Sequence, residues 1–221
     1  MQIRHPATYS ASILAAIYDI LRGRGLTGGD LLDPMAGTGK IAELFKFGFT
    51  GRIYCNDIEE EWCAASGVVW THCDAANLSD VYLAESFDVI VTSPTYGNRM
   101  ADNYLPEHGR ENRRTYVCGL GRRLSDGNTG TMQFGPAYCA AHQRIWAEQK
   151  RLLRKDGILL VNVSDHIRRG KVIGVVDWHT RALSGLGFTV SALPVATPRY
   201  RRGANSRLRV EHEVILIAEV K

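Results

Sequence analysis

The alternation of short apolar runs with segments of helical periodicity is the feature that most constrains this chain. Over residues 9–21, apolar side chains recur every three or four positions, which is typical of an amphipathic helix. The apolar run at 30–34 ends in a turn rich in glycine, and helical spacing resumes at 41–47. A strand therefore passes through a tight turn into a helix.

The same alternation continues along the rest of the chain. Further strands are expected at 52–56, 68–73, 87–92, 157–163, 188–193 and 210–220, and further helices at 59–66, 136–153 and 173–186. Strands that alternate with helices form a parallel sheet covered on both faces, because each crossover must return over the sheet. Only a loop separates the last two strands, so we expect them to pair as an antiparallel hairpin. The sequence predicts an α/β fold with a mostly parallel, seven-stranded sheet.

Composition limits the class of protein. A chain of 221 residues, 45% hydrophobic and 23% charged, fits one globular domain, 1–221. No apolar stretch approaches the roughly 18 residues of a membrane span, and no signal segment follows the N-terminus, so we expect a cytoplasmic protein without a membrane partner. Five cysteines without a C-x-x-C pair indicate reduced, mostly buried thiols and no metal site.

Residues 97–135 form an interval too long for an ordinary connection. They contain six arginines, several glycines and almost no apolar periodicity. Long segments of this kind are usually functional or disordered. We expect an inserted loop region that lies over the active site.

The first motif is D-P-M-A-G-T-G, residues 33–39, between a strand and a helix. Its glycines allow close approach of a ligand to a helix N-terminus, although a turn without ligand and a dinucleotide site remain alternatives. Asp57 follows the second strand 20 residues after Gly37, the interval at which an open α/β sheet places a carboxylate on a ribose. Asp74 ends the third strand, and the two acids together favour a nucleoside ligand.

The second motif is T-S-P-T-Y-G, residues 92–97, directly after the fourth strand. By itself, a proline here only ends a strand. Together with the first motif, the chain resembles the amino-methyltransferases that act on adenine and cytosine in DNA, whose motifs are D-P-x-x-G-x-G and (D/N/S)-P-P-(Y/F/W). The stretches H-P-A-T-Y-S (5–10), N-V-S-D-H-I-R (162–168) and R-G-A-N (202–205) are similar to phage and bacterial members. The resemblance implies a Rossmann-like class I methyltransferase fold and S-adenosylmethionine as cofactor.

Carried over residue by residue, the resemblance implies three groups of site residues. The catalytic group is Ser93, Pro94 and Tyr96, with Tyr96 stacking on the target base. The cofactor group is Pro6, Ala7, Asp33, Pro34, Ala36, Gly37, Gly39, Asp57, Ile58, Asp74 and Ala75. The substrate group is Thr95, Arg99, Arg199, Arg201, Arg202 and Asn205, in which the arginines are assigned by the charge of their segments. Thr95 departs from the family pattern, which has a second proline at this position.

The implied reaction needs neither a metal nor a strong base. An exocyclic amine is a poor nucleophile because its lone pair is delocalised into the ring, and two acceptors help it to attack the methyl group in line. The base must leave the duplex or be presented in a single strand. Asp165 and His166 follow the fifth strand and are expected in the same cleft, as a proton relay or as a structural hydrogen-bonded pair, and no catalytic role is assigned to either. His108, His142 and His179 are expected at the surface or at helix caps.

The substrate is the open question. Five arginines within residues 199–209 and a net charge of +4 suit a nucleic-acid partner, more readily DNA than RNA. Adenine and cytosine both remain possible, with a slight preference for cytosine. The alternatives are an RNA methyltransferase acting on a guanine or adenine amine, a small-molecule methyltransferase, and a non-catalytic nucleic-acid-binding partner subunit. The sequence indicates no oligomeric state.

Overall fold

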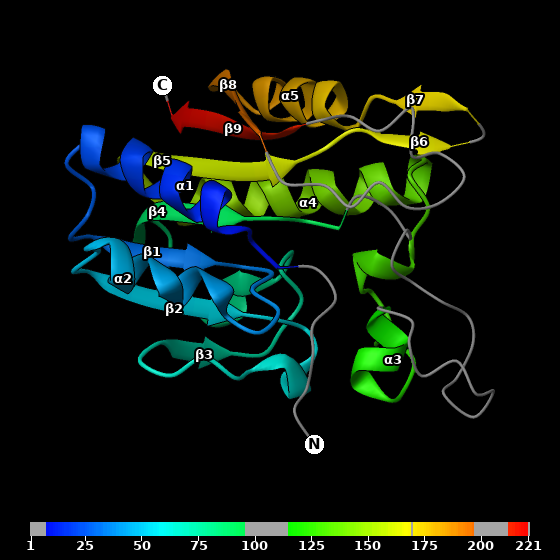
Figure 1. The fold of residues 1–221 in the computed structure, drawn as a ribbon, viewed down its shortest axis with the longest axis horizontal. Coiled ribbons are helices and arrows are strands. Elements are labelled where there is room, and N and C mark those ends of the chain that lie inside the picture. Colours follow the sequence, from blue (N-terminus) through cyan, green and yellow to red (C-terminus); the bar gives the residue numbers. More distant parts are fainter. Residues whose placement is uncertain (1–7, 96–114, 169, 197–211, 221) are drawn as a thin grey trace.

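A seven-stranded sheet in the order β3-β2-β1-β4-β5-β9-β8 forms the centre of the computed structural model, which describes residues 8–95, 115–168, 170–196 and 212–220 (Figure 1). Its strands are β1 (Asp30–Asp33), β2 (Arg52–Asn56), β3 (Val69–Thr71), β4 (Phe87–Thr92), β5 (Leu153–Val163), β8 (Phe188–Ala196) and β9 (His212–Val220). The helices are α1 (Ala11–Gly23), α2 (Leu44–Phe47), α3 (Tyr116–Leu120), α4 (Pro136–Leu152) and α5 (Val175–Gly185).

The pairing of the strands confirms the predicted fold class. The five strands β3, β2, β1, β4 and β5 run parallel, and β9 pairs antiparallel with both β5 and β8. The expected hairpin between the last two strands is therefore present. Parallel strands have their carboxyl ends at one edge of the sheet, so the loops that follow β1, β2, β4 and β5 meet there.

Two hydrophobic layers cover the sheet, one on each face. Successive residues of a strand point to opposite faces, so Leu31 packs with the layer of α1 and α2, while Leu32 packs with the layer of α4 and α5. In Figure 1, α1 and α2 lie in front of the sheet and α4 lies behind it. Burial on both faces explains why the strands are continuous apolar runs in the sequence.

Three local features differ from the sequence prediction. The helix expected at 59–66 is wrong: only one 3₁₀ turn forms, at Glu60–Trp62, because Cys63 is extended and the Ala65 carbonyl accepts the indole N–H of Trp70. A small hairpin, β6 (His166–Arg168) with β7 (Lys171–Ile173), was not predicted. Within the interval 97–135, residues 115–135 contain α3 and a 3₁₀ turn at Thr129–Thr131.

The four cysteines whose side chains are described are free thiols. Only Cys55 is fully buried, whereas Cys63, Cys73 and Cys139 are partly exposed, so the expectation of mostly buried thiols is wrong. Burial nevertheless raises the pKa of all four.

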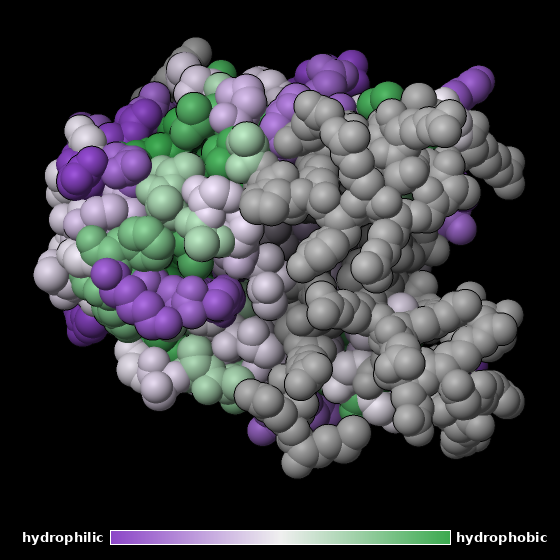
Figure 2. All heavy atoms as spheres, in the orientation of Figure 1, coloured by the Kyte–Doolittle hydropathy of each residue, from purple (hydrophilic) through white to green (hydrophobic). Residues whose placement is uncertain are grey.

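The described surface is mixed in polarity. Figure 2 shows apolar and charged side chains interleaved over α1 and α2 on the face in view. In the ranges that the structure describes, no helix is both long and apolar enough to cross a membrane.

Candidate active site

A pocket of about 400 Å³ lies at the carboxyl ends of the parallel strands. Six of the residues assigned to the cofactor line it: Pro34, Ala36, Asp57, Ile58, Asp74 and Ala75. The second motif lines the same pocket through Ser93, Pro94 and Thr95. The two motifs, separated by more than 50 residues in the sequence, therefore share one cavity.

The turn after β1 is built around Asp33, which is fully buried. Its carboxylate accepts the hydroxyl proton of Tyr9 at 3.0 Å and the backbone N–H of Met35 at 3.2 Å. The Tyr9 bond fastens the segment before α1 to the turn. Gly39 has φ +72°, and a Cβ there would lie 2.6 Å from the Cβ of Ala65. This position therefore requires glycine because of its backbone conformation and its close packing against Ala65, and it does not line the pocket.

Asp57 joins the turn after β1 to the turn after β2. Its two carboxylate oxygens accept the backbone N–H of Gly37 at 2.7 Å and of Glu59 at 2.9 Å. The preceding residue, Asn56, is also buried, and its amide donates to the carbonyls of Pro34 at 3.0 Å and Cys73 at 2.9 Å. The ends of β1, β2 and β3 are thus held together by side chains of β2 and its turn.

Burial makes both carboxyl groups unusually weak acids. Desolvation raises the pKa of Asp33 to about 7, although the hydrogen bonds from Met35 and Tyr9 act in the opposite direction. Desolvation also raises the pKa of Asp57 to about 6. The negative charge of Asp57 contributes to the shift at Asp33. Two buried carboxyls at one end of a pocket favour a ligand that carries a cation or several hydroxyl donors.

The opposite part of the pocket is formed by the ends of three neighbouring strands. Asn162 near the end of β5 is 2% exposed, and its amide nitrogen lies 3.3 Å from Ser93 Oγ and 2.7 Å from Glu213 Oε2. Glu213 belongs to β9, whose start lies beside the end of β5 because the two strands are antiparallel. Asn162 and Glu213 were not assigned by sequence reasoning. Their only sequence signal was the N-V-S-D-H-I-R resemblance that begins at Asn162.

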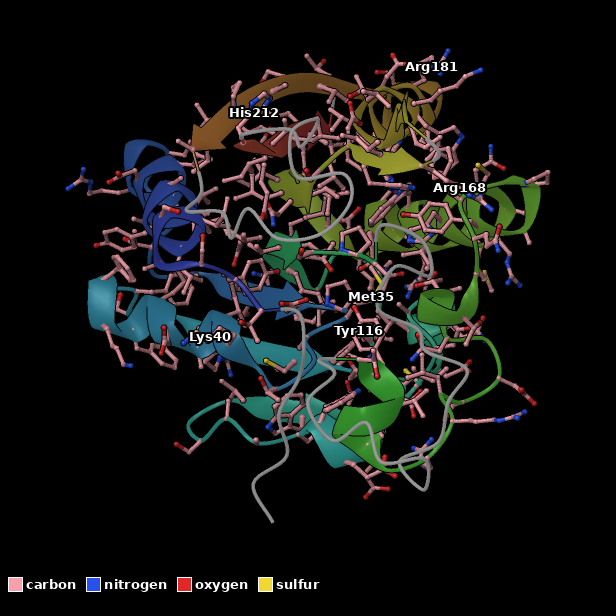
Figure 3. The ribbon with its side chains drawn as sticks, turned by 45° about the vertical axis from the view of Figure 1, so that its right-hand side comes forward. Met35, Lys40, Tyr116, Arg168, Arg181 and His212 are labelled. Atoms are coloured by element: carbon pink, nitrogen blue, oxygen red, sulfur yellow. The ribbon has the colours of Figure 1, made fainter. Side chains whose placement is uncertain are left out.

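The interval after the second motif supplies a further part of the lining, through Tyr116, Leu124, Gly127, Asn128 and Thr129. Figure 3 places Tyr116, at the start of α3, close to Met35 in the turn after β1. The described part of this interval, residues 115–135, therefore lines the same pocket as the two motifs.

The buried carboxylate of Glu59 fastens this interval to the pocket. It is 0% exposed and accepts four hydrogen bonds: from Arg122 Nη2 at 2.7 Å, from the backbone and hydroxyl of Ser125 at 2.7 and 2.9 Å, and from Asn128 Nδ2 at 2.8 Å. Glu61 also pairs with Arg122, at 2.6 Å, and raises the pKa of its guanidinium. Glu59 lies two residues after Asp57, so one short segment holds both the glycine turn and the inserted interval.

Several assigned residues do not line the pocket or cannot be placed. Asp33, Gly37 and Gly39 lie in the turn behind it, as described above. Asp165 and His166 are not among its lining residues: Asp165 Oδ1 accepts the N–H of Val176 at 2.9 Å and caps α5, which corrects their expected position in the cleft. The remaining assigned residues lie outside the described part of the chain: Pro6, Ala7, Tyr96, Arg99, Arg199, Arg201, Arg202 and Asn205.

Two histidines expected at the surface are buried instead. His142 and His179 are each 0% exposed, on the facing sides of α4 and α5. Burial lowers the pKa of His142 to about 4 and that of His179 well below its usual value, so both are neutral. Their polarity suggested a surface position, but in the core both ring nitrogens of His179 are hydrogen-bonded, and His142 is hydrogen-bonded through Nδ1 and stacks on Tyr138. His108 lies outside the described residues.

Comparison with known proteins identifies the fold. No protein-family model and no curated protein sequence matches the chain. Among solved structures, 1,6-didemethyltoxoflavin-N1-methyltransferase from Burkholderia thailandensis, solved with S-adenosylhomocysteine, is 15% identical, with a TM-score of 0.56 over 96% of this chain and 79% of that one. TrmN from Thermus thermophilus is 17% identical, with a TM-score of 0.53, and the chain covers 49% of it.

This chain has the class I methyltransferase fold. The [4+2]-cyclase SpnF also resembles it, at 16% identity and a TM-score of 0.54 over 98% of this chain and 85% of that one. Structures named for a methyltransferase and for a cyclase share the fold, so the reaction must be argued from the pocket.

The raised pKa of Asp33 predicts that the ligand-free protein loses stability as the pH rises. The folded carboxyl keeps its proton to about pH 7, whereas the ordinary pKa of an aspartate is 3.8, so the folded state binds more protons than the unfolded state between these values. The free energy of unfolding therefore falls over this window. We expect Asp33→Asn to reduce the loss between pH 5 and pH 8, measured by urea unfolding, by roughly 2 kcal/mol at 1.36 kcal/mol per pKa unit.

The matched control is Asp177→Asn, because Asp177 is exposed and pairs with Arg181 on the surface of α5. This variant should keep the slope of the wild type. A wild-type protein whose stability rises from pH 5 to pH 8, with Asp33→Asn identical to it, would contradict the assignment of a buried, weakly acidic carboxyl.

Glu59→Gln is expected to release the inserted interval from the pocket. The NH₂ group of the Gln side chain would face N–H and O–H donors that now bond the Glu59 carboxylate. The loss of charge-assisted hydrogen bonds of this kind costs about 1 to 3 kcal/mol. Cleavage by trypsin after Arg123, followed by mass spectrometry, should become about tenfold faster. Glu61→Gln is the control, since it removes an exposed partner of Arg122 and should change the rate little. Equal rates for both variants would show that Glu59 does not hold the interval.

Proposed function

We propose that this protein transfers a methyl group from S-adenosylmethionine to the exocyclic amino group of a base in DNA, cytosine N4 or adenine N6. One observation carries the proposal. The turn after β1, through Pro34 and Ala36, and the Ser93-Pro94-Thr95 turn line the same pocket of about 400 Å³. That volume is typical of a site for a small ligand. The resemblance of both motifs to the amino-methyltransferases supplies the reaction.

The residues present fit the proposed cofactor. Asp57 and Asp74 line the pocket at the ends of neighbouring strands and offer carboxylate acceptors to ribose hydroxyls and to the adenine amine. Ile58 and Ala75 give apolar surface for the purine ring. Asp33 lies behind the glycine turn and, once ionised, attracts the cationic methionine end. When bound, S-adenosylmethionine supplies an electrophilic methyl group on a sulfonium.

The Ser93-Pro94-Thr95 turn holds the target amine. The Ser93 hydroxyl and the Pro94 carbonyl accept its two N–H groups, which directs the nitrogen lone pair toward the methyl group. Methyl transfer to this nitrogen would release the thioether S-adenosylhomocysteine as leaving group, and the amine would lose one proton. Tyr96, by resemblance, stacks on the base. The arginines of 199–209, by their charge, contact phosphates.

Glu213 favours a second candidate, methylation of a guanine amine in RNA. Its carboxylate is an acceptor that lines the pocket beside Asn162 and Ser93. Guanine presents two neighbouring donors on its Watson–Crick edge, N1–H and the N2 amine, whereas adenine and cytosine present an amine beside an acceptor nitrogen. The nucleic acid and the base methylated separate the two candidates.

Radiolabelled S-adenosylmethionine incubated with duplex DNA, single-stranded DNA and RNA tests the proposal. We expect label in DNA, released on digestion as N4-methylcytosine or N6-methyladenine, and a steep loss of DNA binding with salt. Ser93→Ala should lower the turnover number about tenfold to a hundredfold, since it removes one of two acceptors, while Ser191→Ala on the exposed side of β8 should not. Label only in the guanine of RNA would support the second candidate, and no label in either would refute both.

Cofactor affinity should depend on pH through Asp33. The carboxyl has a pKa of about 7 in the ligand-free pocket and must lose its proton to attract the cationic amine. Binding of S-adenosylmethionine, measured by calorimetry, should therefore tighten by about tenfold between pH 6 and pH 8, with a proton released at the lower pH. Asp33→Asn should bind weakly and without this dependence. A wild-type affinity that falls over the same range would contradict the role of Asp33.

A further inference from the structure

A buried chain of hydrogen bonds leads from the packing of α4 and α5 to the second motif. The indole N–H of Trp146 donates to Nδ1 of His179 at 3.1 Å. Nε2 of His179 lies 3.0 Å from the hydroxyl of Tyr138, and that hydroxyl donates to the carbonyl of Thr95 at 2.7 Å. Trp146, His179 and Tyr138 are each 0% exposed.

The chemistry of the groups fixes the direction of this chain. Tyr138 has one hydroxyl proton, which goes to the carbonyl of Thr95, so its oxygen must accept from Nε2–H of His179. His179 then presents Nδ1 as an acceptor, and the indole of Trp146 supplies the donor. Burial keeps His179 neutral, as this arrangement requires. One tautomer satisfies every bond.

His142 holds Tyr138 from a second side. The rings of these two residues stack with centroids 3.9 Å apart and an interplanar angle of 29°. The Nδ1–H of His142 donates to the backbone carbonyl of Tyr138, one turn earlier in α4, at 3.0 Å. The phenol ring is therefore confined by its stacking partner and by both bonds of its hydroxyl.

The position that Tyr138 contacts is the one that departs from the family motif. A proline ring fixes φ near −65°, and a Pro-Pro pair would therefore fix the peptide that carries the Pro94 carbonyl. Thr95 has no ring. Its hydroxyl instead pairs with that of Thr129 at 3.0 Å, and its carbonyl accepts from Tyr138. Bonds to both the side chain and the carbonyl oppose rotation about φ of Thr95.

We propose that Tyr138, oriented by His179 and Trp146, is a positioning residue that replaces the rigidity of the missing second proline and so aims the Pro94 carbonyl at the target amine. This assignment rests on the proposed function, in which that carbonyl is an acceptor for the amine. Tyr138 acts through Thr95 and is not among the residues that line the pocket.

The test combines Tyr138→Phe, Thr95→Pro and the double variant. Tyr138→Phe should lower kcat for methyl transfer about tenfold, which converts to about 1.4 kcal/mol in the activation free energy, while KM for nucleic acid and the affinity for S-adenosylmethionine stay within twofold. Thr95→Pro in the Tyr138→Phe background should restore kcat to within twofold of Thr95→Pro alone, because the ring supplies the lost constraint. Tyr82→Phe is the matched control, since the Tyr82 hydroxyl pairs with Thr71, its ring packs on Phe87, and it is not among the residues that line the pocket.

Failure to restore kcat, or an equal loss in Tyr82→Phe, would overturn the proposal. So would a wild-type His179 that carries its proton on Nδ1, as read from the long-range ¹H–¹⁵N spectrum of its ring. These outcomes concern the positioning chain alone.

A readout without activity separates this proposal from the proposed function. Hydrogen exchange of the peptide over residues 92–95 should be about tenfold faster in Tyr138→Phe than in the wild type. Unchanged exchange would refute the anchoring of the turn. If exchange is faster in Tyr138→Phe but the wild type methylates no nucleic acid, the proposed function is refuted. Tyr138 would then hold Thr95 in place, but not for the proposed reaction.

Discussion

The hydrogen bond from the backbone of Gly37 to the carboxylate of Asp57 is the contact on which the pocket depends. It is 2.7 Å long and joins the turn after β1 to the turn after β2. Two parallel strands can bring their loops to one edge of a sheet, but backbone pairing does not fix how those loops lie. A buried acceptor that bonds N–H groups from both turns does so, and it leaves the glycine turn open toward the cavity.

That arrangement has an electrostatic cost. Asp33 and Asp57 are buried within one small volume, and desolvation raises the pKa of each. Without a ligand, part of this cost is relieved by protonation. A cationic ligand in the pocket offsets the cost at Asp33 through its charge, and Asp57 lines the pocket and bonds a hydroxyl-rich ligand directly. The desolvation that weakens the ligand-free protein therefore strengthens binding. The two effects have the same origin.

The inserted interval and the second motif are held by separate sets of hydrogen bonds. Glu59 bonds the interval through one acceptor group with four donors. Tyr138 and Thr129 hold Thr95 from the other side, through the packing of α4 and α5 and the 3₁₀ turn at Thr129–Thr131. In both places a buried polar group, Glu59 or Tyr138, makes more than one hydrogen bond, which fixes the geometry more narrowly than an apolar contact would. Because solved structures that share this fold are named for a methyltransferase and for a cyclase, the local contacts, rather than the fold, set what this chain can do.

By itself, the sequence determined the order of strands and helices, the antiparallel final pair and the two motifs, because hydrophobic periodicity and glycine turns are local properties of the chain. The strands β2 and β4 match their predicted bounds, since each is a buried apolar run ended by a polar residue. The helix predicted at 59–66 was wrong because the contacts that shape this segment come from Trp70 and from residues 122–128. Only the tertiary structure decided that Glu59, Asn162 and Glu213 belong to the site and that His179 belongs to the core. Their roles depend on partners far away in the sequence, and a polar residue shows no local sign that such a partner will satisfy it when buried.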